Sequence, residues 1–188
     1  MVNINDIKSK LKNLDNFRYK HSCLVKDTAV KLAKKYEANI DKVKIAALLH
    51  DYARNYSNDN LINIVKKNNI NVDKWELEIP ELLHSPVAAF IANRDYAIND
   101  HEILNAIRYH TIGRPKMSKI EKIIFVADII EPNRDFPDIN LIRNAADNNL
   151  DKAVFLVCDF TIKYNIDQKK LIHPNTLLTR NYLLKGEN

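Results

Sequence analysis

The sequence contains only two glycines, Gly113 and Gly186, in 188 residues. Glycine is the residue that most readily adopts the positive φ angles of tight hairpin turns, so a chain built from β-hairpins normally contains more of it. No segment of convincing length alternates apolar and polar residues as a half-buried strand does. The scarcity of glycine therefore favours helices over sheets.

Apolar residues recur at helical spacing along most of the chain. Ser118, followed three residues later by Glu121, predicts a capping box. Asp41, Ser57 and either Asp100 or Asn99 are predicted N-caps. The expected helices lie at about 3–14, 21–37, 43–49, 58–68, 81–93, 101–110, 119–130, 139–147, 150–165 and 175–185. We predict an all-α fold, a compact bundle of nine or ten helices that forms one domain over residues 1–188.

The N-terminal segment, MVNINDIKSKL, lacks the apolar core of a signal peptide, and no apolar stretch approaches the roughly 20 residues needed to span a bilayer. Cys23 and Cys158 match no metal or redox spacing. Both lie in apolar surroundings, so we expect buried thiols in a reducing compartment rather than a disulfide. These features predict a cytoplasmic protein without membrane contact.

The formal net charge is +5, which could suggest a nucleic-acid partner. The lysines are scattered, however, and form no block of five or six basic residues. Nucleic-acid binding is therefore the less favoured interpretation, because a small phosphate-rich substrate would be attracted equally well.

The positions of certain histidines and aspartates are the most informative feature for function. We expect His21 and His84 to open helices and His50 and His110 to end them. Asp128 lies within the apolar run KIIFVADII, where an unpaired carboxylate would be costly to bury. An arginine partner would be the usual solution for a lone aspartate, but the companion histidines favour a metal cation.

The dipeptide His50-Asp51 stands at a predicted helix end, where both side chains can turn toward one ion. With His21 upstream and Asp128 downstream it forms the ordered pattern H…HD…D, and the chain resembles the HD-domain phosphohydrolase superfamily. It resembles most closely the YqeK-type bacterial diadenosine tetraphosphatases, which cut their substrate symmetrically into two molecules of ADP. The segments that carry this resemblance are RYKHS at 18–22, ALLHDYAR at 47–54, LLHSPVAA at 82–89, AIRYHTIGRPKMS at 106–118, ADIIEPNRDFP at 127–137 and IHPNT at 172–176. One departure is Asp138, where a glycine is expected after Phe-Pro.

The resemblance implies an iron-containing centre, and a set of imidazoles and carboxylates also suits manganese or zinc. The ligands expected for the first ion are His21, His50, Asp51 and Asp128. His84 and His110 are expected either to bind a second ion bridged by Asp51 or to donate hydrogen bonds to phosphate oxygens, and the second-ion role is slightly favoured. A metal-bound water is the expected nucleophile, and the predicted catalytic residues are Asp51, His84 and His110.

Arg134 follows Asp128 by six residues, and its planar guanidinium suits a phosphate group; pairing with Glu131 or Asp135 is the alternative. Arg18 precedes His21 by one helical turn and could reach the same pocket. Segment 172–176 is expected near the nucleotide, with a helix cap made by Asn175 or Thr176 as the structural alternative. The predicted substrate-binding residues are Arg18, His21, His84, His110, Arg134, His173, Asn175 and Thr176. Arg114 and Lys116 are weaker candidates, and His101 is expected to be solvated.

Two other functions are compatible with the sequence. An HD enzyme acting on a deoxynucleoside triphosphate, a nucleoside monophosphate or guanosine tetraphosphate would use the same metal ligands. A basic, non-catalytic RNA-binding helical domain is the less favoured alternative. The sequence leaves open the metal, the number of ions, the base preference and the oligomeric state, for which a homodimer is one possibility.

Overall fold

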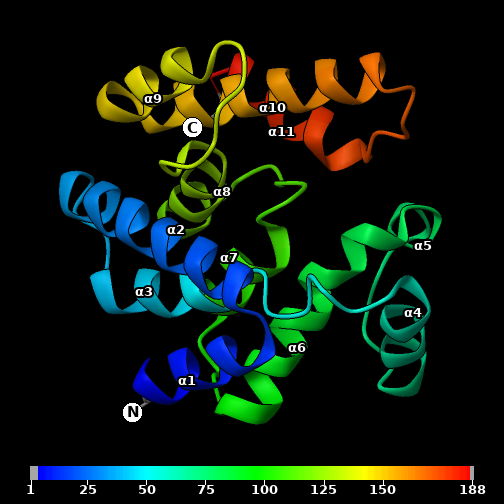
Figure 1. The fold of residues 1–188 in the computed structure, drawn as a ribbon. Coiled ribbons are helices and arrows are strands. Elements are labelled where there is room, and N and C mark those ends of the chain that lie inside the picture. Colours follow the sequence, from blue (N-terminus) through cyan, green and yellow to red (C-terminus); the bar gives the residue numbers. More distant parts are fainter. Residues whose placement is uncertain (1–3, 187–188) are drawn as a thin grey trace.

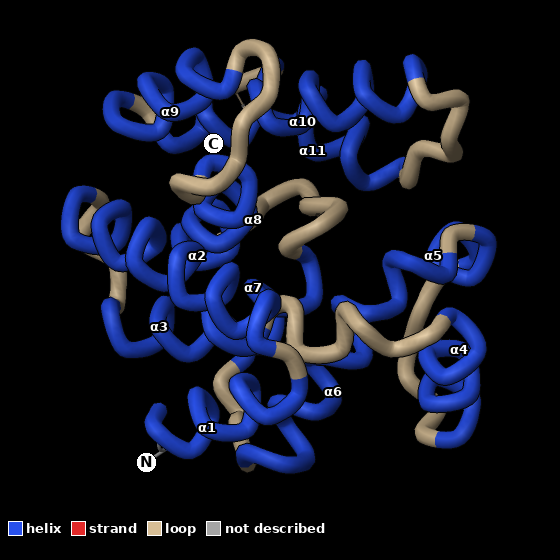
Figure 2. The backbone as a smooth tube through the Cα atoms, viewed as in Figure 1, coloured by secondary structure: helices blue, strands red, loops and turns tan. Residues whose placement is uncertain are grey.

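The computed structural model describes residues 4–186, which contain helices and no strand (Figures 1 and 2). The elements are α1 (Ile4–Leu14), α2 (Asn16–Lys35), α3 (Ile40–Leu49), α4 (Asn58–Lys67), α5 (Lys74–Glu78), the 3-10 helix η1 (Pro80–Leu83), α6 (His84–Tyr96), α7 (His101–Tyr109), α8 (Lys119–Ile130), α9 (Ile139–Asn148), α10 (Leu150–Asp167) and α11 (Pro174–Leu184). The prediction of an all-α fold is confirmed. Residue 3, at the start of the first expected helix, lies outside the described residues.

Helix α8 lies at the centre of the molecule. It packs against α2, α3 and α7 on one side and against α9 and α10 on the other, and in Figure 1 the helices α9, α10 and α11 form a layer above it. Its residues Ile123 to Ala127 are all buried, as expected for a helix that is apolar around most of its circumference. Buried apolar side chains from α1 to α4 and from α6 to α10 join them in one core cluster.

Several predicted helix starts are confirmed by their caps. Ser57 and Asp100 accept hydrogen bonds from backbone N–H groups of the following turn. Ser118 and Glu121 form the predicted capping box at the start of α8, whose bounds coincide with the expected 119–130. Local capping chemistry therefore defines these boundaries.

Other boundaries differ from the prediction. Helix α2 begins five residues before His21, because Asp15 accepts a hydrogen bond from the backbone of Arg18 and caps an earlier turn. His21 thus lies inside the helix instead of opening it. Asn39, not Asp41, caps α3, and Asp41 stands in its first turn. Helix α5 was not predicted, since five residues are too short to show a helical period.

The two cysteines are unpaired, as predicted, but only Cys158 is buried, whereas Cys23 is half-buried. His101 is exposed, as expected. Within residues 4–186, no helix is both long and apolar enough to cross a membrane.

Candidate metal centre

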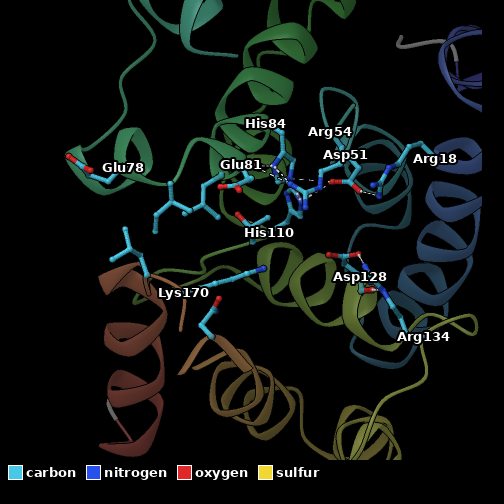
Figure 3. A pocket seen from close by; sticks show the side chains of 15 residues that line it. Arg18, Asp51, Arg54, Glu78, Glu81, His84, His110, Asp128, Arg134 and Lys170 are labelled. Carbon is cyan, nitrogen blue, oxygen red and sulfur yellow. Dashed lines mark hydrogen bonds and ion pairs between the residues drawn. The ribbon is translucent and has the colours of Figure 1, made fainter. Parts of the chain in front are cut away.

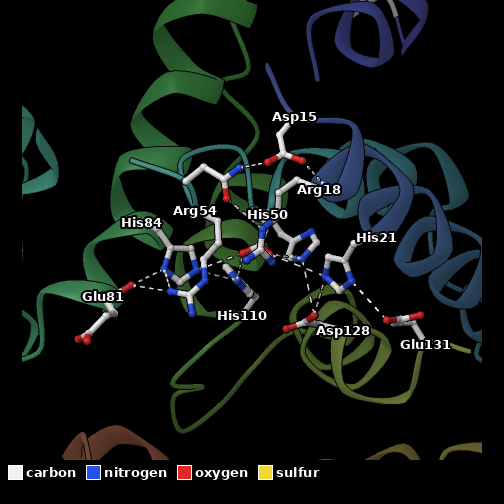
Figure 4. A network of polar contacts seen from close by, with 12 residues as sticks. Asp15, Arg18, His21, His50, Arg54, Glu81, His84, His110, Asp128 and Glu131 are labelled. Carbon is white, nitrogen blue, oxygen red and sulfur yellow. Dashed lines mark hydrogen bonds and ion pairs between the residues drawn. The ribbon is translucent and has the colours of Figure 1, made fainter. Parts of the chain in front are cut away.

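Six side chains that the sequence singled out meet in the interior, although they come from five different helices. His21 lies on α2, His50 and Asp51 follow α3, and His84 begins α6. His110 follows α7, and Asp128 lies on α8. Figure 4 shows the four imidazole rings and Asp128 in one network of polar contacts. Three overlapping sets of potential ligand atoms lie within 4.8 Å of one another: His21, His50 and Asp51; His50, His110 and Asp128; and Asp51, His84 and His110.

Asp51 turns one carboxylate oxygen toward each half of this network. Its Oδ2 lies 3.8 Å from Nε2 of both His21 and His50. Its Oδ1 lies 3.2 Å from Nε2 of His84 and 3.5 Å from Nε2 of His110. A carboxylate that faces two groups of imidazoles in this way is placed to bridge two cations.

Three of the histidines are oriented by the same local device. Each directly follows a helix and donates from Nδ1 to the carbonyl three residues earlier: His50 to Ala47 at 2.7 Å, and His110 to Ile107 at 2.8 Å. His84, after the 3-10 helix, donates to Glu81 at 2.5 Å. The last carbonyls of a helix have no partner within it, so a following imidazole can satisfy one of them. Because a carbonyl only accepts, the proton sits on Nδ1 and Nε2 keeps a free lone pair.

His21 obtains the same orientation from a carboxylate. Its Nδ1 contacts Glu131 Oε1 at 3.4 Å, while its Nε2 lies 3.1 Å from Asp128 Oδ1. Nε2 of His21 and Nε2 of His50 are both buried, and neither makes a hydrogen bond among the described residues. Buried nitrogen lone pairs that face carboxylates, each on a ring held by its other nitrogen, are the arrangement of metal-binding histidines. These side chains therefore fit a divalent metal.

Neighbouring histidines lower the pKa of both aspartates. Burial alone would raise the pKa of Asp51, but His50, His110 and His84 hold that pKa well below its usual range. Burial would likewise raise the pKa of Asp128, which His21 and His50 keep well below its usual range. Carboxylate oxygens beside imidazole nitrogens suit a transition metal better than calcium.

Residues 18–133 match the family model described as HD domain, and this range contains all six side chains. The chain belongs to the HD domain family. The residues of the H…HD…D pattern lie within the matched range, and the geometry shows them converging on one centre.

Curated relatives extend this HD-domain similarity over most of the chain. A symmetrical bis(5'-nucleosyl)-tetraphosphatase of Bacillus subtilis is 38% identical, covering 92% of each chain. A protein of the same name from Staphylococcus aureus is 39% identical, covering 88% of this chain and 86% of its own length. A crystal structure from Clostridium acetobutylicum, of an HD superfamily hydrolase described as involved in NAD metabolism, is 40% identical with a TM-score of 0.94 and covers 99% of both chains.

A cavity of about 530 Å³ opens onto the candidate metal centre (Figure 3). Its volume is within the roughly 300–1,000 Å³ usual for small-molecule sites. Asp51, His84, His110 and Asp128 line its inner end. The rest of the wall includes the α5–η1 segment, the loop between α10 and α11, and three arginines from other parts of the chain, so it is built from segments that are far apart in sequence.

The two predicted arginines both reach this cavity. Arg18 Nη1 lies 3.3 Å from Asp51 Oδ2, and its Nε donates to Asn55. Arg134 Nη2 lies 3.1 Å from Asp128 Oδ1. Its predicted alternative partner Glu131 is also close, at 3.8 Å. Each guanidinium thus contacts a candidate metal ligand and lines the cavity.

Two further cationic residues of the cavity were not predicted. Arg54 donates to the carbonyl of Glu81, the same oxygen that orients His84. Lys170, on the loop after α10, extends into the cavity in Figure 3. Arg54 could have been noticed because it stands three residues after Asp51 in ALLHDYAR. Lys170 carries no local signal, since only the chain's return after α10 brings it to the site.

No residue of segment 172–176 lines this cavity, although Lys170 and Leu171 directly before it do. His173 is buried, caps α11 by accepting from the backbone of Asn175, and lies 3.0 Å from Asp73 Oδ2. Thr176 Oγ1 donates to the carbonyl of Ile112. The cap is therefore made by His173 rather than by Asn175 or Thr176. The contacts of this segment are structural, and a role for it in nucleotide binding stays a prediction.

Proposed function

We propose that this chain is a metal-dependent hydrolase that cuts diadenosine tetraphosphate symmetrically into two molecules of ADP. The observation that carries the proposal is the bridging geometry of Asp51, with imidazole nitrogens facing each of its oxygens, in an HD-domain chain. The relatives that are symmetrical bis(5'-nucleosyl)-tetraphosphatases support the choice of substrate. We further propose iron as the metal, with manganese as the substitute.

Two ions fit the ligand geometry better than one. His21, His50, Asp51 and Asp128 would hold the first ion, and His84 and His110 the second, with Asp51 shared. When bound, the metal would lower the pKa of water toward neutrality and so make hydroxide available as the nucleophile. This arrangement favours the second-ion role of His84 and His110 over direct hydrogen bonding to phosphate.

The chain's own residues supply orientation and charge. The departing group is ADP, which is already stable as an anion, so strong general-acid assistance is unnecessary. The negative charge of the tetraphosphate needs neutralising, and Arg18, Arg54, Arg134 and Lys170 surround the cavity for that purpose. Arg18 and Arg134 would exchange their contacts with Asp51 and Asp128 for phosphate oxygens when these carboxylates bind cations.

A substrate panel tests the reaction. Protein loaded with iron or manganese is incubated with diadenosine tetraphosphate, NAD, deoxynucleoside triphosphates, nucleoside monophosphates and guanosine tetraphosphate, and the products are separated by chromatography. We expect ADP as the sole product of diadenosine tetraphosphate and slower turnover of the others. Formation of AMP with ATP, or preferential turnover of another compound, would refute the proposal. Salt-sensitive RNA binding by a metal-free, inactive protein would favour the non-catalytic alternative.

Variants test the site. Asp51→Ala and Asp128→Ala should each lower turnover by more than roughly 100-fold. Removing a residue that only hydrogen-bonds to a metal ligand costs up to about 100-fold, so removing a ligand itself should cost more. Bound metal, measured by elemental analysis, should fall in both, while circular dichroism should show retained helices. His101→Ala is the matched control, because this exposed histidine lies away from the centre. Normal catalysis in either aspartate variant would contradict the assignment.

A further inference from the structure

A second cavity, of about 460 Å³, adjoins the first at the candidate metal centre. The two cavities share five lining residues: His110, Thr111, Asp128, Arg134 and Asn165. Two spaces of similar volume therefore meet at the candidate ligands His110 and Asp128. A substrate with two equal halves that is cut at its middle extends to both sides of the reacting phosphates. It therefore needs two spaces that meet at the metal centre.

The wall of the second cavity carries a row of three aromatic rings. Phe136 and Phe160 stack with their centroids 4.1 Å apart and their planes at 24°. Tyr164 continues the row, 6.2 Å from Phe160 at 27°. Phe136 and Phe160 are half-buried and Tyr164 is 47% exposed, so part of the row is open to a ligand. Near-parallel aromatic faces are the surfaces on which nucleobases stack.

The rest of this wall combines apolar side chains with the amide of Asn165. Phe125, Ile129 and Val157 supply apolar surface behind the rings. Asn165 uses its amide N–H to bind the carbonyl of Thr161 at 2.8 Å, one helical turn earlier. That contact fixes the orientation of the amide at the boundary between the two cavities.

The aromatic row lies outside the stretch that matches the HD domain. That match ends at residue 133, whereas Phe136 is in the following loop and Phe160 and Tyr164 are on α10. Lys170, on the wall of the first cavity, is also beyond it. The HD-domain segment thus carries the candidate metal ligands, and the segment after it supplies surfaces that can distinguish one ligand from another.

We propose that the second cavity is a nucleoside site, in which the purine of one half of the substrate stacks on the row Phe136–Phe160–Tyr164. The polyphosphate then crosses the shared residues beside Arg134, and the other nucleoside occupies the first cavity. This inference rests on the proposed function in taking a dinucleotide as substrate. It adds the residues that recognise the base.

Binding of ADP and of inorganic tripolyphosphate to the metal-loaded protein, measured by calorimetry, separates base from phosphate recognition. Base–aromatic stacking is typically worth about 5-fold to 160-fold in affinity per base. Tyr164→Leu and Phe160→Leu should each weaken ADP binding by about 10-fold and leave tripolyphosphate binding close to wild type. With diadenosine tetraphosphate as substrate, both variants should raise KM more than they lower kcat.

Two further variants make the test specific. Tyr164→Phe keeps the ring and should bind ADP as the wild type does. If the hydroxyl group and not the ring held the base, Tyr164→Phe would bind ADP as weakly as Tyr164→Leu. Phe155→Leu is the matched control on the same helix, since the Phe155 ring faces Arg180 and Lys152 instead of the cavity. If Tyr164→Leu and Phe160→Leu both bind ADP as wild type does, or lose tripolyphosphate equally, the nucleoside site is refuted. Failure of the wild-type protein to form ADP from diadenosine tetraphosphate would instead refute the proposed function, whatever the variants bind.

Discussion

Asp138 holds a backbone conformation that few side chains adopt. Its φ is +69° and its ψ is 3°, in the left-handed region, and its side chain makes no capping hydrogen bond at the start of α9. This is the position where the family resemblance leads one to expect glycine, which has no Cβ to clash there. An aspartate at this position therefore strains the backbone of the loop after Arg134.

Replacing this residue by glycine should relieve the strain. Asp138→Gly is expected to raise the free energy of unfolding by roughly 0.5–1 kcal/mol, because the left-handed penalty exceeds the added flexibility of the unfolded chain. Asp138→Ala, which keeps a Cβ but removes the carboxylate, should give no gain. Urea denaturation measures both, and a glycine variant less stable than the wild type would contradict the argument.

The two thiols should differ sharply in reactivity. Burial raises the pKa of Cys158 to about 12, so at pH 8 only about one molecule in 10,000 carries the thiolate there. Cys23 is half-buried. A thiol-specific chromogenic reagent should therefore modify at most one cysteine in the folded protein and both in denaturant. Rapid modification of two thiols under native conditions would show that the packing around Cys158 opens readily.

At the scale of elements, the first turn of α8 is held by a capping box. Ser118 accepts from the backbone N–H of Glu121, and the carboxylate of Glu121 accepts in return from the backbone of Ser118. Glu121 is buried and also pairs with Arg114 at 2.6 Å. The capping box thus joins the helix to the preceding loop as well as satisfying its free N–H groups.

Ser118→Ala should lower the free energy of unfolding by about 1 kcal/mol, the usual loss for a removed N-cap side chain. Ser9→Ala, at an exposed position within α1, makes the same chemical change without removing a cap and should stay within about 0.5 kcal/mol of wild type. Thermal denaturation of both variants provides the comparison. Equal effects would mean that the cap of α8 contributes nothing of its own.

At the scale of the whole molecule, the candidate ligands lie on or directly after five helices: α2, α3, α6, α7 and α8. Ions bound to these ligands stabilise only the folded state, because the unfolded chain does not assemble the site. At a metal concentration about 100 times the dissociation constant, the gain is about 2.7 kcal/mol.

Metal removal should accordingly lower the melting temperature by about 5–10 °C in a chain of this size. Adding manganese or iron back should restore it. Asp128→Asn provides the control, since a variant that binds metal weakly should lose most of the difference between chelated and reloaded protein. A melting temperature that is insensitive to chelation would contradict a site that joins five helices.

Much of the centre could be predicted from local sequence. Helices such as α8 were found with correct bounds because capping and apolar periodicity involve residues only a few positions apart. Asp128 was found because a carboxylate within an apolar run is energetically costly without a partner. The start of α2 was missed because Asp15 can cap a turn that the apolar pattern does not mark.

The sequence by itself determined the fold class, because helical period and capping are properties of neighbouring residues. It also predicted the six residues of the candidate centre, from the position of Asp128 within an apolar run and from the resemblance of the H…HD…D pattern to a known family. Only the tertiary structure decided that Asp51 divides its oxygens between two pairs of histidines. It also decided that Lys170 and the aromatic row reach the same centre, and that His173 pairs with Asp73, 100 residues away. These contacts depend on how whole helices pack, and no local pattern of apolar or polar residues encodes which distant side chains will meet.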